Sequence, residues 1–273
     1  MSDTDERRRK PRGRLRPLGN LLYRVLRLIA RHVRGFYGAV LTYLSVSFFV
    51  GIAAVWAFVV MADTMLAGST TRLDEAVLTW LETHRTPLLD RIALEVTALG
   101  NFATLTVIVL AVSVFLWLTR HRLSVGLLVL AVLGGNVVNG LLKNFYDRPR
   151  PTIVDWGTDV ASYSFPSGHS MGAFIAYASV AYLGGRLEPT PRLRWTTWGI
   201  AGLLILAIGL SRMYLGVHYP SDVIAGYLAG LAWLAFLISG LAAIRYYSNR
   251  KPEIEAEERD LHAEEERDMG LRE

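Results

Sequence analysis

The sequence predicts an all-α, polytopic membrane protein in which six transmembrane helices form a bundle, with short interfacial helices between the first two spans. Composition supports this, because 52% of the 273 residues are hydrophobic and only 19% are charged. The charges gather at the chain ends and in short connections, which leaves six apolar runs near the roughly 20 residues that a helix needs to cross a bilayer. The runs cover residues 35–62, 99–118, 123–142, 168–185, 195–211 and 223–244. They are continuous rather than alternating in polarity, which excludes a transmembrane β-barrel.

The first element is a basic arm at residues 1–34, with eleven Lys or Arg against three acidic residues. Leu18, Leu22, Val25 and Ile29 recur at helical spacing, so part of the arm can form an amphipathic helix on an anionic inner leaflet. A simple topology anchor explains the arm equally well. The apolar run at 35–62 is too long for a signal peptide and lacks a small-residue cleavage site, so we expect a retained first span.

The connection at 63–98 has apolar residues at helical intervals that Pro87 interrupts, which predicts one or two short helices at the membrane interface. Such helices could roof a site, although interfacial packing alone also explains them. Residues 35–245 are then the six-span domain. Residues 246–273 form an acidic tail, predicted to be disordered or weakly helical.

The distribution of Lys and Arg predicts the orientation of the spans. Basic residues mark the two ends of the six-span domain and the connections at 119–122 and 186–194, so the positive-inside rule places both termini in the cytoplasm. The connections at 63–98, 143–167 and 212–222 then face outward. Four cations oppose this bias, which suggests that they bind an anion: Lys143, Arg148, Arg150 and Arg212. The abundance of Ala, Leu and Arg fits a GC-rich bacterial genome and therefore a bacterial plasma membrane.

Three polar clusters lie on the outward connections: KNFYDRPRP at 143–151, FPSGHS at 165–170 and SRMYLGVHYPSD at 211–222. Their cations suit a phosphoryl group, because a guanidinium fork matches phosphate oxygens and an ammonium supplies a compact charge. Ser167 and Gly168 precede an apolar run, where free backbone N–H groups at a helix N-terminus attract anions. The candidate phosphate-binding residues are Lys143, Arg150, Ser167, Gly168 and Arg212.

Two histidines supply candidate catalytic groups. His218 and Asp222 are four residues apart, so the carboxylate can orient the imidazole and leave its other nitrogen free to attack. His169, from a different connection, suits the protonation of a departing oxygen. The alternatives are that Asp222 only caps a helix and that the histidines only satisfy backbone groups at the interface. Asn136 and Asn139 share a helix face with Lys143, and hydrogen bonds between helices are the favoured explanation for them.

These clusters resemble the three-part signature of the type 2 phosphatidic acid phosphatase superfamily, and the six-span layout resembles its membrane branch. The matching positions are Lys143, Arg150, Pro151, Pro166, Ser167, Gly168, His169, Ser211, Arg212, His218 and Asp222. The resemblance implies that His218 forms a phosphohistidine, that Asp222 orients it, and that His169 protonates the leaving group and then activates water. It implies phosphate binding by the five residues above, and no metal or other cofactor.

The predicted function is hydrolysis of a membrane lipid phosphate or diphosphate, with the bilayer and the lipid as partners and no nucleic acid. Candidate substrates are undecaprenyl diphosphate, phosphatidic acid and phosphatidylglycerophosphate, and an outward site favours the polyprenyl carrier. Phosphotransfer to another lipid through the same residues is the alternative. A transporter or non-catalytic lipid-binding protein is less favoured, because apart from His169 the runs lack ionisable side chains.

Overall fold

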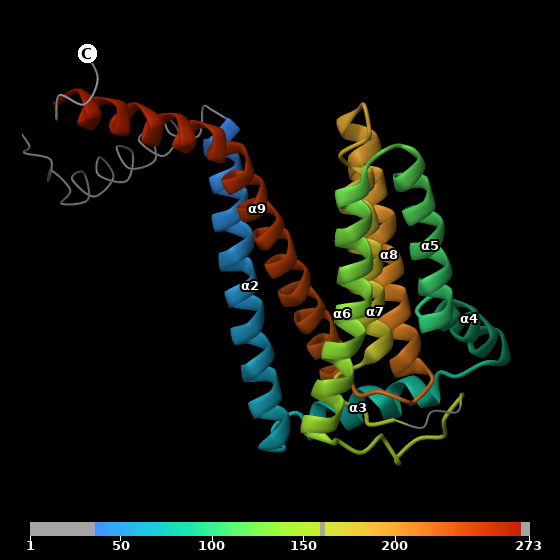
Figure 1. The fold of residues 1–273 in the computed structure, drawn as a ribbon. Helices are drawn as coiled ribbons and strands as arrows, with labels where there is room; N and C mark the ends of the chain where they lie inside the picture. Colours follow the sequence, from blue (N-terminus) through green and yellow to red (C-terminus); the bar gives the residue numbers. More distant parts are fainter. Residues whose placement is uncertain (1–35, 159–161, 269–273) are drawn as a thin grey trace, which may run out of the picture. The chain divides into compact units, whose positions relative to one another are not determined.

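The structure, a computed structural model, describes residues 36–158 and 162–268, and these residues form helices and connections without strands. The helices are α2 (Phe36–Leu66), α3 (Thr71–Thr83), α4 (Pro87–Ala98), α5 (Phe102–Leu118), α6 (Arg122–Tyr146), α7 (Gly168–Gly184), α8 (Pro191–Tyr214) and α9 (Pro220–Asp268) (Figure 1). The predicted all-α class is therefore confirmed. The basic arm at 1–34 lies outside the described residues.

The chain divides into two compact units. One is residues 44–241, which contain every residue of the predicted site, and the described residues of the other are 36–43 and 242–268. In the second unit the described backbone is helical at 36–43 and from 242 to Asp268, so the acidic tail is helical over its described part. The site is built entirely within the first unit.

Each predicted span coincides with a helix, but the helices differ in length. Four segments are long and apolar enough to cross a membrane: Leu44–Leu66, Arg122–Tyr146, Pro191–Tyr214 and Pro220–Ile244. A fifth span results if α4 and α5, which meet at a 48° bend, are counted as one broken crossing. With 17 residues each, α5 and α7 are shorter than these segments, so helix length alone supports a multi-pass membrane protein with four or five candidate spans, and the predicted six are not confirmed.

The two short helices predicted between the first spans are present as α3 and α4. Pro87 does not break a helix but begins one, at a position where its missing N–H costs no hydrogen bond. Thr86 caps this start, and its Oγ1 accepts a hydrogen bond from the Leu89 N–H at 3.2 Å. Both helices pack against α8, which places them beside the helix that carries Arg212.

The centre of this unit is α7, which packs against α5, α6 and α8. Alanines at 173, 176, 178 and 181 are buried along it, and such small side chains let neighbouring helices approach closely. At one end of the unit lie α3, the α6–α7 connection and the α8–α9 connection (Figure 1). The three polar clusters of the sequence therefore meet at the same end of the helices.

The start of α9 packs directly on the backbone that begins α7. A Cβ atom added at Gly226 would lie 2.7 Å from the Ser167 carbonyl oxygen, whereas one added at Gly240 on the same helix meets nothing within 4 Å. Only a residue without a side chain fits at Gly226, because neither backbone can move without disturbing its own helix.

We expect Gly226→Ala to reduce the free energy of unfolding by about 1–3 kcal/mol, because the added methyl overpacks the α7–α9 contact. Gly240→Ala is the matched control and should be neutral. The measurement is the thermal unfolding midpoint of the purified protein in detergent. Equal midpoints for the two variants would contradict the close approach.

Candidate active site

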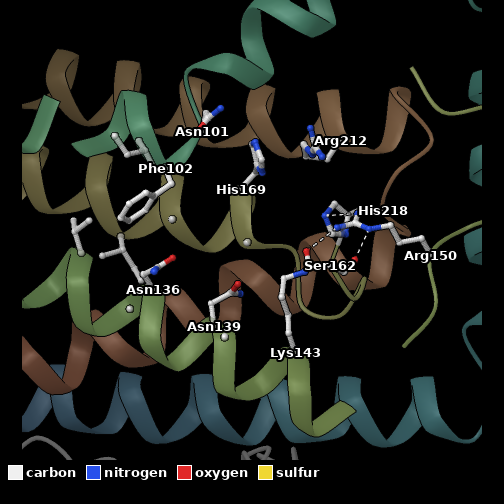
Figure 2. Close-up of a pocket in the computed structure, with 18 residues that line it drawn as sticks. Asn101, Phe102, Asn136, Asn139, Lys143, Arg150, Ser162, His169, Arg212 and His218 are labelled. Atoms are coloured by element: carbon white, nitrogen blue, oxygen red, sulfur yellow. Dashed lines mark hydrogen bonds between the residues drawn. The ribbon is translucent and has the colours of Figure 1, made fainter. Parts of the chain in front are cut away.

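A cavity of about 420 Å³ lies where α5, α6, α7 and α8 meet the two polar connections (Figure 2). Of the eight residues singled out from the sequence, six line it: Lys143, Arg150, Gly168, His169, Arg212 and His218. They come from three segments distant in sequence, so tertiary structure brings the predicted clusters into one chamber.

His218 lies at one end of the cavity and is 1% exposed. Its Nδ1 lies 3.5 Å from Asp222 Oδ2 and 3.4 Å from Ser164 Oγ. Its Nε2 is on the opposite side of the ring, 3.3 Å from the Arg150 Nη1 atom. The imidazole therefore turns Nδ1 toward a carboxylate and Nε2 toward the cavity.

Burial determines the charge of His218. It lowers the pKa of the imidazole to about 3, although the hydrogen bond and the negative charge of Asp222 act to raise it. The ring is consequently neutral at physiological pH, with a lone pair available on one nitrogen. A neutral imidazole is the form that a nucleophile requires.

Asp222 is completely buried behind His218, and its carboxylate is satisfied on both oxygens. Oδ2 accepts hydrogen bonds from Ser164 Oγ at 2.5 Å and from the Tyr219 N–H at 2.9 Å, while Oδ1 accepts one from Arg148 Nη1 at 2.6 Å. Asp222 does cap the start of α9 through its bond from the Tyr219 N–H, but its carboxylate also faces His218 and Arg148, so capping is not its only contact.

Arg212 is a buried cation with nitrogen donors that lack an acceptor among the described residues. It is 2% exposed, and Nη1 donates to Thr97 Oγ1 at 2.9 Å. Its Nε and Nη2 are buried and have no hydrogen-bond partner among the described residues. Buried donors of this kind are costly, so the two nitrogen atoms favour an oxyanion as the acceptor of their N–H groups.

The other two cations are held by backbone carbonyl groups. Arg150 donates from Nε to the Ser162 carbonyl and from Nη1 to the Val217 carbonyl, each at 2.6 Å. Lys143 Nζ donates to the Tyr163 carbonyl. These bonds fix the direction of the side chains but do not neutralise them, so three positive charges line one chamber.

Gly168 lines the cavity beside Asn139 and Lys143. A Cβ atom there would be 2.9 Å from Asn139 Oδ1 and 3.7 Å from Lys143 Cε. Any larger residue would therefore displace the Asn139 amide from the chamber wall. His169 follows in the first turn of α7, and Figure 2 shows it between the His218 end and the end lined by Asn136 and Phe102.

Comparison with known proteins agrees with this geometry. The model of the PAP2 superfamily matches residues 124–246. Phosphatidylglycerophosphatase B of Bacillus subtilis is 32% identical over 185 residues, which are 67% of this chain and 90% of that protein. An undecaprenyl-diphosphatase of Sulfolobus acidocaldarius is 36% identical over 90 residues, which are 33% of this chain and 34% of that protein. The crystal structure of a transmembrane PAP2 type phosphatidylglycerolphosphate phosphatase from Bacillus subtilis superposes with a TM-score of 0.66 at 29% identity, covering 70% of this chain and 94% of that one.

The chain belongs to the PAP2 superfamily. Its membrane relatives are lipid phosphatases, which are metal-independent hydrolases, and the chain is an enzyme of this class. Among the side chains that the structure describes, which exclude those of the acidic tail, no three His, Asp or Glu groups lie close enough together to hold a metal ion.

Two residues of this PAP2 protein differ from expectation. Ser167 is completely buried and does not line the cavity; its N–H donates to the Asp222 carbonyl at 2.9 Å and its Oγ caps α7. Arg148, expected to bind an anion from the substrate, instead donates to Asp222 and to Asp74. The reason is that its side chain turns away from the chamber, toward buried carboxylates that a sequence pattern does not reveal.

The favoured explanation of the asparagines holds for Asn139, whose Nδ2 on α6 donates a weak hydrogen bond to Met171 Sδ on α7 at 3.5 Å. Both Asn136 and Asn139 line the cavity, as does Asn101 at the start of α5. Ser164 and Thr97, which support Asp222 and Arg212, were not predicted at all. Neither carries a sequence signal beyond being a small polar residue.

The lowered pKa of His218 predicts where acid inhibits this PAP2 enzyme. Because the neutral form persists down to a pKa of about 3, kcat/KM should not fall near pH 6.5 through protonation of this group. The measurement is a pH–rate profile corrected for titration of the substrate phosphate. After this correction, a fall in kcat/KM near pH 6.5 that does not come from His169 would contradict a buried neutral His218.

We expect Thr97→Val to weaken phosphate binding, because Arg212 loses the hydrogen bond that directs its guanidinium. The cost of a bond to a charged donor corresponds to about a tenfold fall in kcat/KM. Thr106→Val on α5, whose hydroxyl only bonds the Phe102 carbonyl of its own helix, is the control. Equal kinetics for both variants would show that Arg212 needs no support from α4.

Proposed function

We propose that this protein hydrolyses a membrane lipid phosphate through a phosphohistidine intermediate on His218. The observation that carries the proposal is the orientation of one buried imidazole: Nδ1 faces Asp222 at 3.5 Å, and Nε2 faces a chamber lined by three cations. An imidazole held in this way attacks only through Nε2.

In the first step Nε2 of His218 forms a bond to phosphorus as the bond from phosphorus to the lipid oxygen breaks. His169 donates a proton to that departing oxygen, and Asp222 stabilises the positive charge that develops on the His218 ring. In the second step His169 takes a proton from water, the resulting hydroxide attacks phosphorus, and inorganic phosphate leaves with His218 restored.

Lys143, Arg150 and Arg212 stabilise the transition state. The equatorial oxygens carry the charge during phosphoryl transfer, and fixed cations in a desolvated chamber act on them without reorganising. The two unpartnered N–H groups of Arg212 support this role, because they gain acceptors only when an oxyanion is bound. The N-terminal end of α7 at Gly168 adds its dipole.

The proposal includes the predicted topology: six crossings, with the short α5 and α7 counted as spans, both termini in the cytoplasm and the chamber on the outward side. The Lys and Arg excess in the alternate connections supports this orientation. A site at that level can receive a lipid directly from the outer leaflet. Labelling of single cysteines introduced at residue 121 and residue 156 would test it, since only the second should react from outside.

The uncharged end of the cavity supports a substrate whose leaving group is an alcohol. Figure 2 shows Asn101, Phe102 and Asn136 on the side of His169 away from His218, and every cation that lines the cavity lies elsewhere. A second phosphate would lie among amides without a countercharge, whereas hydroxyl groups would find hydrogen-bond partners. This favours phosphatidylglycerophosphate or phosphatidic acid over undecaprenyl diphosphate.

The catalytic proposal predicts that His218→Ala lowers phosphate release by about a thousandfold or more, as expected when a nucleophile is removed. Detergent-solubilised protein should keep its elution profile on size exclusion, and a radiolabelled phosphoryl group should be trapped on wild type but not on the variant. His84→Ala, an exposed histidine at the end of α3 that does not line the cavity, is the control. Normal turnover by His218→Ala would refute the mechanism.

The substrate proposal predicts a higher kcat/KM for phosphatidylglycerophosphate than for undecaprenyl diphosphate. We expect Asn136→Leu to reduce this preference by about fivefold, the worth of one lost hydrogen bond. Leu141→Ile, at an exposed position on α6 outside the cavity lining, is the matched control. Phosphate release measured over the panel in mixed micelles decides between the lipids, and faster release from the diphosphate would overturn the assignment.

A further inference from the structure

Asp74 is a buried carboxylate that the mechanism above does not use. It lies in the first turn of α3, a helix whose other buried side chain is Leu78, and it is 1% exposed. A buried charge is strongly unfavourable unless it is paired and hydrogen-bonded. Its presence on a short helix between two spans therefore needs a physical reason.

The contacts of Asp74 supply one. Oδ1 accepts a hydrogen bond from the Ser221 N–H at 3.0 Å, and Oδ2 accepts one from Ser221 Oγ at 2.5 Å. Oδ2 also accepts one from Arg148 Nη2 at 3.0 Å. Asp74 thus holds the first turn of α9 next to Asp222 and, at the same time, one arm of the Arg148 guanidinium.

Arg148 links this carboxylate to Asp222. Its Nη1 donates to Asp222 Oδ1 at 2.6 Å and to Ser221 Oγ at 2.8 Å, while Nη2 is bound by Asp74. The guanidinium carbon also lies 4.1 Å from the centre of the Tyr219 ring, which stabilises its charge from one face. One planar cation is therefore fixed between two buried carboxylates.

The bridge determines which oxygen of Asp222 faces the imidazole. Because Arg148 occupies Oδ1, the carboxylate cannot rotate freely, and Oδ2 stays directed at His218 Nδ1. Asp74 matters for charge as well as position. Without it, Arg148 would direct its full charge at Asp222 and compete with the His218 ring for the same carboxylate.

We propose that Asp74 and Arg148 are positioning residues for the nucleophile, acting through Asp222, and that α3 is in this way a part of the catalytic apparatus. The inference rests on the proposed role of His218. It assigns to Arg148 a task different from that of the neighbouring Arg150, which faces the chamber. It also predicts that damage to the bridge slows chemistry while leaving the phosphate chamber intact.

The test compares Asp74→Asn with wild type, using purified protein in detergent micelles and one lipid phosphate substrate. We expect kcat to fall about tenfold to a hundredfold, as misplacement of a reacting group by a fraction of an ångström does, with KM changed less than about twofold. Inhibition by vanadate should be unchanged, because Lys143, Arg150 and Arg212 do not contact Asp74. Asp90→Asn, which removes an exposed partner of Arg85, is the control.

A second variant separates positioning from stability. The pair Asp74→Asn with Arg148→Met removes both charges, so the unfolding temperature should recover relative to Arg148→Met with Asp74 intact, where a carboxylate remains buried without its cation. The rate should not recover, because Oδ1 of Asp222 still lacks its donor. Recovery of kcat together with stability would overturn the proposal.

Two further outcomes would overturn the inference. A loss of vanadate binding in Asp74→Asn would mean that the whole chamber had collapsed and that the role is structural, which overturns the inference. An unchanged kcat would overturn it as well. His218→Ala measured in parallel distinguishes the two levels: if wild type and His218→Ala release phosphate equally, the proposed function fails, whereas an active wild type with an unaffected Asp74→Asn removes only this inference.

Discussion

The Asp222 carboxylate is the contact on which the site depends. It is completely buried at the start of α9 and receives hydrogen bonds from Ser164 and Arg148 in the α6–α7 connection and from the Tyr219 N–H beside it. The backbone carbonyl of Asp222 accepts a hydrogen bond from the N–H of Ser167, the residue just before α7. One residue thus joins the α6–α7 connection, the start of α7 and the start of α9. The imidazole of His218 takes its orientation from this joint.

Burial and charge have opposite effects in the chamber, and the balance between them suits phosphoryl chemistry. Desolvation keeps His218 neutral in spite of the carboxylate beside it, while Arg212 stays buried with two N–H groups that lack a protein partner. Leaving such donors unsatisfied costs folding free energy. The oxygens of a phosphoryl group are acceptors that would satisfy these donors, which is the physical basis of the proposed anion site.

Arg148 and Arg150, which are separated by one proline, show how little the sequence says about the direction in which a side chain points. Arg148 and Arg150 have similar neighbours in KNFYDRPRP, and both oppose the positive-inside bias. Arg150 reaches the cavity and approaches His218 Nε2, whereas Arg148 turns to Asp74 and Asp222. In an extended connection, successive side chains two residues apart share a general side, but which of them meets a carboxylate depends on α3, which lies some 70 residues earlier. The local sequence around the two arginines contains no information about that helix.

The sequence by itself determined that the protein is a helical membrane protein and, α9 excepted, where its apolar helices begin and end within a few residues. It also predicted a phosphate site made of Lys143, Arg150, His169, Arg212, His218 and Asp222, of which all but Asp222 line one cavity. Unbroken apolar runs and closely spaced polar residues carry that information, because bilayer thickness and hydrogen-bonding chemistry constrain them directly. Only the tertiary structure decided that Ser167 is buried, that Asn136 and Asn139 face the cavity, and that Asp74, Thr97 and Ser164 support the reacting groups. Those roles arise from contacts between helices far apart in the chain, and packing geometry, rather than residue type, selects them.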